Sequence, residues 1–517
     1  MMAALKWWET AIIYQIYPRS FQDSNGDGIG DLPGITSRLD YIANLGVDAI
    51  WISPFYPSPQ KDFGYDVSDY CGVHSEYGTM DDLDALIVTA HELGLKVMID
   101  IVPAHCSDMH SWFVESRQSR DNSKSDWFHW VDPQPDGSAP TNWLSFFGGR
   151  AWTWEPRRQQ YYLHNFLPSQ PNLNHANPAV REAICDVARF WFDRGVDGFR
   201  MDAVHTINAD RAPYRNNLAK PDFELGDLPQ EQQPFFRQLH DSAQLNQPAI
   251  QTFIEQFRKV ADSYSGDRFL MGELHGDDPT LASETFTAPG RLHATYNFSL
   301  LEWGGLDVDG LKSAISEAIG RFNGSGRLSF AFSNHDVPRS ATRQLAPLGL
   351  SEDDQEAMQL LLLKLEASLI GSTCVYQGEE LALSDVQDIP ISQMQDPWGI
   401  EFAPLFLGRD TCRTPMVWEK AKNNWSGFSE ASKTWLPIAE KHIQRSGIDE
   451  AARSGSVYDQ FSKFLAWRAQ QPAMVHANSM TEIKGGPKQI IFERISDQQK
   501  LRFCFDFETL TTSVTEV

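Results

Sequence analysis

Apolar residues in this chain form short continuous runs that alternate with longer stretches of helical spacing. The segment TMDDLDALIVTAHELGLKVMID, from Thr79, shows a capping-box start, apolar side chains on one helical face, a stop at Gly94 and a short apolar run. The segment from Asn177 repeats this order, with Pro178 in the first turn and Gly195 after the last. The pattern predicts alternating helices and strands.

Eight short apolar runs of this kind recur along the chain. They begin at Ala11, Val47, Lys96, Val196, Arg268, Ala294, Leu328 and Thr373. Most of them are separated by segments with helical periodicity, as the crossovers of a parallel sheet require. The repeats therefore predict an α/β fold, a parallel (β/α)8 TIM barrel.

Three parts of the chain depart from this pattern. Residues 104–175, rich in Trp, Pro, Ser and Gly, indicate a small inserted domain after the third strand, at the mouth of the barrel. A polar, Pro- and Gln-rich stretch from His205 to about Ala249 suggests a second insertion. Near the C-terminus, one helical stripe precedes the strand patterns QIIFERI and LRFCFDF. The predicted domains are a barrel in two parts, 1–103 and 176–455, inserted domain B, 104–175, and a small C-terminal β domain, 456–517.

Composition excludes several classes of function. The formal net charge of −25 disfavours nucleic acid and anionic membranes as partners, but it is compatible with a small neutral substrate. No stretch stays apolar for about 18 residues, and the N-terminus lacks a signal-peptide pattern, so we expect a cytoplasmic protein without membrane contact. Six scattered cysteines without a CxxC pair fit free thiols. Monomer and homodimer both remain open.

The stretch DSNGDGIGDL alternates oxygen donors in the order of a calcium loop. The twelfth position, where a calcium sensor carries a bidentate Glu, is Gly34, which argues against a calcium switch. A single structural Ca2+ or Mg2+ is favoured over an ordinary solvated turn, and no organic cofactor is expected. The predicted metal ligands are Asp23, Asn25, Asp27, Ile29 through its carbonyl, and Asp31.

Polar side chains gather at the predicted strand ends, where a barrel keeps its active site. They are Asp100, His105, Arg200, Asp202, Glu273, His335 and Asp336. Each carboxylate alone could be a structural residue or a helix cap. Several like charges at one rim are costly, and such clusters are usually retained for function.

Four of these segments, DIVPAH, GFRMDAVH, MGELHG and FSNHD, resemble the conserved regions of the alpha-amylase family, glycoside hydrolase family 13. DSNGDGIGDLPGI, DFGYDVSDY, QQYYLHNFLPSQPNLN and GRDTCRTPMVW are similar to its oligo-1,6-glucosidase and alpha-glucosidase branch. The resemblance runs from about Ala11 to Trp418, most of the chain. In this branch the DxNxDxIxD loop holds a structural cation away from the chemistry.

The resemblance implies that Asp202 is the nucleophile, Glu273 the general acid/base, and Asp336 a ligand that stabilises the transition state. Retaining hydrolysis needs the two reacting carboxyl groups about 5 to 5.5 Å apart. Arg200 projects to the same side of its strand as Asp202 and should keep that carboxylate ionised. The resemblance further implies a glucose pocket formed by Asp62, Tyr65, His105, Phe147, Phe166, Gln170, His335 and Arg413.

Two positions depart from the family pattern. Ala104 stands where Asn usually precedes the histidine, so a hydrogen bond near the pocket is missing or supplied otherwise. Ala203 follows the nucleophile, where Val accompanies alpha-1,6 bonds and Thr accompanies alpha-1,4 bonds. A small residue leaves room beside the +1 sugar, which favours alpha-1,4 linkages.

The sequence thus predicts a retaining, exo-acting alpha-glucosidase that releases glucose from maltose-like oligosaccharides, with possible transglucosylation. The alternatives are an oligo-1,6-glucosidase, a sucrose hydrolase or a trehalose-phosphate hydrolase. A non-catalytic relative that accompanies amino-acid transporters would have a transmembrane segment and would have lost the catalytic carboxylates. A carbohydrate-binding module would not need both Asp202 and Glu273.

Overall fold

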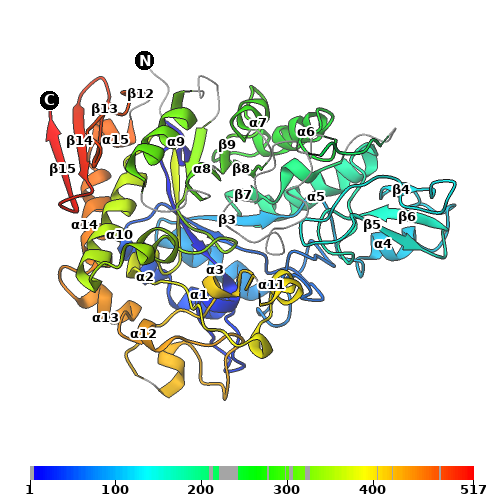
Figure 1. Ribbon diagram of the computed structural model, residues 1–517, viewed down its shortest axis with the longest axis horizontal. Coiled ribbons are helices and arrows are strands. Elements are labelled where there is room, and N and C mark those ends of the chain that lie inside the picture. Colours follow the sequence, from blue (N-terminus) through cyan, green and yellow to red (C-terminus); the bar gives the residue numbers. More distant parts are fainter. Residues whose placement is uncertain are drawn as a thin grey trace.

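Eight parallel strands form a closed barrel at the centre of the computed structural model (Figure 1). The structure describes residues 5–208, 214–219, 243–275, 279–296, 298–301, 307–320, 327–404, 406–421, 423–476 and 479–517. The barrel strands are β1 (Ile12–Ile16), β2 (Ala49–Ile52), β3 (Lys96–Ile101), β7 (Gly198–Met201), β8 (Phe269–Glu273), β9 (Ala294–Tyr296), β10 (Arg327–Phe330) and β11 (Ser372–Tyr376). Each lies within a predicted run or within one residue of it, and β11 closes the barrel on β1. The predicted TIM barrel is confirmed.

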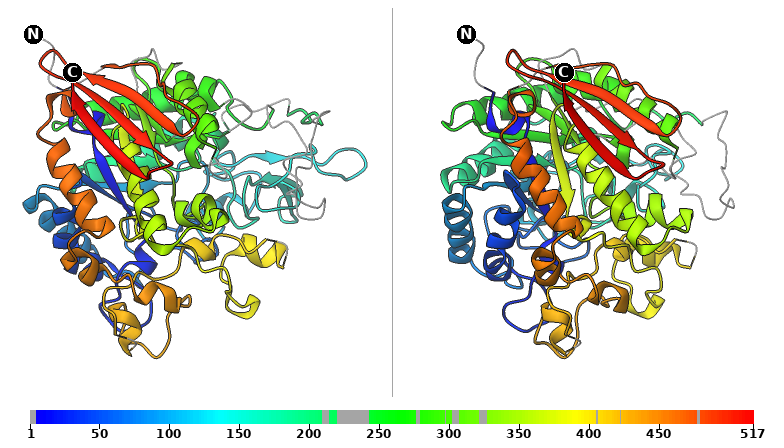
Figure 2. Two further views of the ribbon diagram at one scale, coloured as in Figure 1. Left: turned by 60° about the vertical axis from the view of Figure 1, so that its left-hand side comes forward. Right: turned by 90° about the vertical axis from the view of Figure 1, so that its left-hand side faces the viewer.

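Helices surround this barrel (Figure 2). Two of them, α3 (Met80–Glu92) and α5 (Pro178–Asp193), begin where the sequence predicts. Thr79 forms the capping box of α3 with Asp82, and the Asn177 side chain accepts the N–H of Ala179 at 2.9 Å to cap α5. The other helices are α1 (Leu32–Ser37), α2 (Leu39–Leu45), α4 (Ser111–Ser116), α6 (Ile250–Asp262), α7 (Pro279–Phe286), α8 (Phe298–Leu301), α9 (Val308–Gly320), α10 (Glu352–Glu366), α11 (Pro397–Phe402), α12 (Glu440–Ile443), α13 (Gly447–Ala452), α14 (Val457–Arg468) and α15 (Pro472–Val475).

The two-residue period of the strands separates the core into two parts. Ile13, Trp51 and Met98 belong to a buried cluster inside the barrel, whereas their neighbours Ile12 and Ile50 pack in the larger cluster with the helices. Side chains two residues further along point to the same side. The apolar interior is therefore followed, towards the carboxyl ends, by the polar side chains Gln15, Ser53, Asp100, Arg200 and Glu273.

Two smaller sheets lie outside the barrel. Within the predicted inserted domain, β4 (Trp130–Val131), β6 (Gln160–Leu163) and β5 (Trp152–Glu155) pair in that order at the edge of the molecule (Figure 1). The C-terminal sheet is antiparallel and contains β12 (Ser479–Met480), β13 (Gln489–Ile495), β14 (Lys500–Asp506) and β15 (Thr511–Glu516). The predicted C-terminal β domain is confirmed.

Some predictions about organisation stay open. Of the second insertion, His205 to about Ala249, residues 209–213 and 220–242 lie outside the described residues. The domain boundaries themselves also remain predictions. Within the described part of the chain, no helix has the length and apolar character needed to cross a membrane.

Arg494 connects the C-terminal sheet to the barrel. Its buried Nη1 donates to the backbone carbonyls of Ser368 and Leu369, at 2.9 and 2.6 Å. We predict that Arg494→Ala lowers the free energy of unfolding, measured by urea titration, by about 2 to 4 kcal/mol, because these buried carbonyls lose their donor. Arg502→Ala, which removes a half-exposed partner of Glu493, should cost less than about 1 kcal/mol. Equal losses would contradict the anchoring role.

Candidate active site

The buried guanidinium of Arg200 lies among three carboxylates at the barrel mouth. Its Nη1 donates to Asp100 Oδ1 at 3.0 Å and to Asp202 Oδ1 at 2.7 Å, and its Nη2 lies 2.9 Å from Glu273 Oε2. The strand register creates this arrangement, since Asp100 of β3 pairs directly with Arg200 of β7, and Glu273 ends the next strand, β8. One cation therefore holds three acidic side chains from adjacent strands.

In this group three carboxyl groups surround a single guanidinium. Burial raises the pKa of Asp202 well above its ordinary value, with Arg200 opposing the shift and Glu273 adding to it. Burial likewise raises the pKa of Asp100, to about 6. The expectation that Arg200 keeps Asp202 ionised is therefore wrong for this structure, because burial and the neighbouring carboxylates outweigh the single guanidinium.

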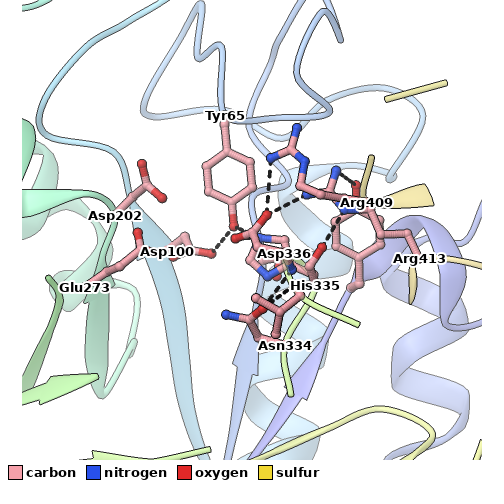
Figure 3. A network of polar contacts seen from close by, with 12 residues as sticks. Tyr65, Asp100, Asp202, Glu273, Asn334, His335, Asp336, Arg409 and Arg413 are labelled. Atoms are coloured by element: carbon pink, nitrogen blue, oxygen red, sulfur yellow. Dashed lines mark hydrogen bonds and ion pairs between the residues drawn. The ribbon is translucent and has the colours of Figure 1, made fainter. Parts of the chain in front are cut away.

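A second group of charges surrounds Asp336, on the other side of the site from Asp202 and Glu273 (Figure 3). Asp336 Oδ1 accepts from Arg413 Nη2 at 2.7 Å and from Arg409 Nη1 at 3.2 Å. Burial opposes ionisation, but His335 and the two arginines together hold the pKa of Asp336 below its ordinary value. Asp336 is therefore ionised, and its side chain is 27% exposed, more than Asp202 or Glu273.

Tyr65 and His335 connect the two groups. The Tyr65 hydroxyl donates to Asp100 Oδ2 at 3.1 Å and lies 2.6 Å from His335 Nε2. Burial lowers the pKa of His335 well below its usual range, so the ring is neutral. Gln15 Nε2 lies 2.7 Å from His335 Nδ1, which assigns the ring proton to Nε2, facing Tyr65 and Asp336. The Tyr65 and His335 rings stack in parallel, with centroids 5.4 Å apart.

The inserted segment closes the remaining side. Gln170 Nε2 donates to Asp62 Oδ2 at 2.9 Å and lies 3.2 Å from His105 Nε2. Burial lowers the pKa of His105 to about 4, so this ring is also neutral. Phe166 contacts His105 and Phe147, with ring centroids 5.2 and 5.5 Å apart. The hydrogen bond from Gln170 to Asp62 attaches the inserted segment to the rim of the barrel.

Arg409 joins the inserted side to Asp336. Its Nη2 lies 2.8 Å from Asp62 Oδ1 and 2.7 Å from Asp396 Oδ1, while Nη1 reaches Asp336. The guanidinium also stands over the ring of Phe147, 4.9 Å from its centroid. A continuous set of contacts thus runs from the three-carboxylate group to the inserted segment.

Comparison with known proteins identifies the family. The model of the alpha amylase catalytic domain matches residues 15–477 of the chain. The chain belongs to the alpha-amylase family. It is a glycoside hydrolase, and its similarity to the proteins described next places it in the alpha-glucosidase and oligo-1,6-glucosidase branch.

Three proteins illustrate the similarity of this family member to others. A probable alpha-glucosidase of Rhizobium meliloti (strain 1021) is 47% identical over 471 residues, covering 90% of this chain and 83% of that protein. An oligo-1,6-glucosidase of Halalkalibacterium halodurans is 34% identical over 535 residues, covering 97% of this chain and 90% of that protein. The crystal structure of an alpha-glucosyl transfer enzyme has a TM-score of 0.90 and 44% identity, covering 97% of this chain and 91% of that one.

The predicted catalytic and pocket residues of this glycoside hydrolase lie together in one network. Its members are Asp62, Tyr65, His105, Phe147, Phe166, Gln170, Arg200, Asp202, Glu273, His335, Asp336 and Arg413. Sequence reasoning missed Arg409 and Asp396, which hold Asp62 and Asp336 together, and Gln15, which orients His335. Arg409 stands in the quoted segment GRDTCRTPMVW, four residues before Arg413, and that segment was the available signal.

Ala104, the first departure from the family pattern, is fully buried. Its backbone carbonyl accepts the N–H of Leu173 at 2.9 Å, and no side-chain hydrogen bond is possible there. The neighbouring His105 is nevertheless held, because Gln170 and the carbonyl of Tyr65 both lie 3.2 Å from its Nε2. The inserted segment supplies the polar contact at this histidine.

The predicted metal loop lies apart from this network, against residues 428–435. Asp23 accepts the N–H groups of Asn25 and Gly28, at 3.0 and 2.8 Å, and Asp27 accepts that of Ile29 at 2.8 Å. Asp31 is occupied as the cap of α1, with Gly34 N–H at 2.7 Å. Among the described residues, no three acidic, His or Cys side chains converge as metal ligands. An ion here would rely on mixed donors, including the Asn25 amide and the Ile29 carbonyl.

Arg409→Lys tests the network. Lysine keeps the charge, but its N–H donors share one nitrogen, so it cannot span the separate positions from which Nη1 and Nη2 of Arg409 reach Asp336, Asp62 and Asp396. We expect kcat/KM for an aryl alpha-glucoside to fall about 100-fold or more, as misplacement of positioning groups commonly does. Arg189→Lys, in a surface ion pair on α5, should change kcat/KM less than about twofold. A similar small effect of Arg409→Lys would exclude Arg409 from the site.

Proposed function

We propose that this glycoside hydrolase is a retaining, exo-acting alpha-glucosidase. It releases alpha-glucose from the non-reducing end of short alpha-1,4-linked gluco-oligosaccharides such as maltose. One observation carries the proposal: the carboxylates of Asp202 and Glu273 contact the same guanidinium, at 2.7 and 2.9 Å. A single cation keeps them close together, which supports retention rather than the wider separation that inversion needs.

The chemistry follows from the charge distribution. Asp202 attacks the anomeric carbon while Glu273, protonated, donates its proton to the leaving oxygen. Asp336 remains ionised beside the sugar, and its charge stabilises the positive charge that develops on the ring. In the second step Glu273 removes a proton from water, whose oxygen attacks the anomeric carbon and displaces the Asp202 carboxylate, so that alpha-glucose leaves with retention.

The exo-acting mode is supported by Arg409. Its ion pair with Asp62, at 2.8 Å, joins the loop after β2 to the loop that carries Asp396, on the side of the site opposite Glu273 (Figure 3). We propose that this ion pair closes the site on that side, so that only a terminal sugar can bind beyond the scissile bond. The neutral His105 and His335 and the amide of Gln170 suit an uncharged sugar with several hydroxyls.

Ala203 bears on the linkage. Its backbone N–H donates to Glu273 Oε2 at 2.8 Å, so residue 203 lies beside the proposed general acid. The methyl group leaves space for the +1 sugar, which favours alpha-1,4 bonds. An oligo-1,6-glucosidase remains the alternative, because proteins of both names are similar to this chain. Transfer of glucose to a second sugar is also proposed, supported by the similarity to an alpha-glucosyl transfer enzyme.

Glucose release from maltose, isomaltose, sucrose and trehalose, measured side by side, tests this function. We expect maltose to be preferred and Asp202→Asn to lose at least about 10^4-fold in kcat, since the nucleophile is removed. Asp186→Asn, an exposed carboxylate on α5, is the matched control and should behave like the parent. Preference for isomaltose would overturn the linkage, and activity of Asp202→Asn would overturn the mechanism.

We also propose that residues 23–31 bind one structural Ca2+ or Mg2+. The side-chain oxygens of Asp23, Asn25 and Asp27 each accept a backbone N–H two residues further on. These hydrogen bonds support the proposal, because they bend the loop around its alternating oxygen ligands. Removal of metal with EDTA should lower Tm by several degrees, and Ca2+ should restore it. Asp27→Ala should abolish the response, and Asp40→Ala, exposed on α2, should keep it. An unchanged Tm would show that hydrogen bonds alone hold the loop.

For the compartment, we propose the cytoplasm, with small oligosaccharides as the partners of the enzyme. The six cysteines support this proposal, since all of them are free thiols and four are fully buried. Free thiols persist in a reducing compartment. The strongly negative charge is compatible with a neutral substrate.

A further inference from the structure

The small sheet of the inserted segment carries a surface hollow that the chemistry described above does not use. Its volume is about 510 Å3, and its lining residues are Arg120, Asp132, Pro133, Trp154, Pro156 and Gln159. β5, which carries Trp154, lies at the edge of the molecule, away from the barrel strands (Figure 1). None of the six residues belongs to the network around Arg200.

Trp154 provides an exposed aromatic surface in this hollow. Its side chain is 41% exposed, although Trp152, two residues earlier on the same strand, is buried in the core of the segment. The Tyr161 ring meets the Trp154 ring edge-on, with centroids 5.1 Å apart, and the Tyr161 hydroxyl is tied to the carbonyl of Gly137. The indole is thus supported from behind while one part of it faces solvent.

The polar groups beside Trp154 are fixed before any ligand arrives. Arg120 donates to the carbonyls of Arg158 and Gln159, both at 2.8 Å, and pairs with Asp132 at 2.9 Å. Gln160 also donates to Asp132, at 3.1 Å. Pro133 and Pro156 restrict the backbone on both sides. A ligand would therefore meet a formed surface and would pay little ordering entropy.

The chemistry of the hollow favours a neutral sugar. The positive charge of Arg120 is compensated by Asp132, so the hollow has no net charge of its own that would select an ionic ligand. A pyranose has an apolar C–H face that fits an aromatic ring and a rim of hydroxyls that fits carboxylate, guanidinium and amide groups. Its six lining residues are also far fewer than the roughly 20 to 30 residues that each side of a stable protein interface contributes.

We propose that this hollow is a second carbohydrate-binding site, which holds one or two glucose units of an alpha-glucan outside the active site. Trp154 is the stacking platform, and Arg120, Asp132 and Gln159 contact hydroxyls. The choice of glucan as ligand rests on the proposed function. Such a site would keep the enzyme near polymeric or oligomeric substrate without taking part in bond cleavage.

Affinity electrophoresis in native gels that contain soluble starch or dextran tests the site. The Asp202→Asn protein serves as parent, so that the polysaccharide is not degraded. We expect the parent to be retarded in at least one gel, and we expect Trp154→Ala in this background to bind about tenfold more weakly. Trp154→Phe should recover most of the retardation, because it restores an aromatic surface.

Val114→Ala is the matched control, since Val114 is a 42% exposed apolar residue of α4 in the same inserted segment. It should be retarded like the parent. Undiminished retardation of Trp154→Ala, or no retardation of the parent in either gel, would overturn the proposal. Hydrolysis separates the two proposals: Trp154→Ala in the active enzyme should leave kcat for maltose unchanged. Absence of maltose hydrolysis by the unmodified enzyme, with Asp202 in place, would contradict the alpha-1,4 function alone.

Discussion

The active site depends on one buried cation. Arg200 is fully buried and is surrounded by Asp100, Asp202 and Glu273, which come from three adjacent strands. Without this guanidinium, three carboxylates at one barrel mouth would repel each other in a medium of low polarity. With it, two of the three charges remain uncompensated, and burial then favours protonation. The same residue therefore makes the cluster possible and leaves it short of positive charge, so that burial raises the pKa of Asp202 and of Asp100.

Around Asp336, on the opposite side of the site, two arginines surround one carboxylate. Asp336 is shared by Arg409 and Arg413, and its pKa is lowered, so this carboxylate keeps its charge while the Arg200 group holds the proton. Two chemically identical carboxyl groups, Asp202 and Asp336, thus differ in pKa because their surroundings differ. Tyr65 and the neutral His335 connect the two sides through hydrogen bonds, which transmit position without adding a net charge.

The barrel and the position of the rim could be predicted because they follow from local rules. Apolar runs with crossover helices define the strands, and the two-residue period then places Asp100, Arg200 and Glu273 on the inside. The long-range contacts could not be predicted this way. Two arginines four residues apart look equivalent in GRDTCRTPMVW, and only the fold shows that Arg409 spans Asp62, Asp396 and Asp336. β15 was missed because its Thr- and Ser-rich segment is largely exposed and has little apolar pattern.

The second departure from the family pattern has a physical reading in the fold. Ala203 has a left-handed backbone, with φ of +42°, and its N–H holds Glu273 Oε2. Because the main chain makes this contact, the side chain at 203 is free to shape the neighbouring sugar site without loss of the hydrogen bond. A β-branched side chain is strained in this conformation, whereas alanine is less so. Alanine at this position therefore lets the chain turn sharply after Asp202 while the main chain of residue 203 holds Glu273.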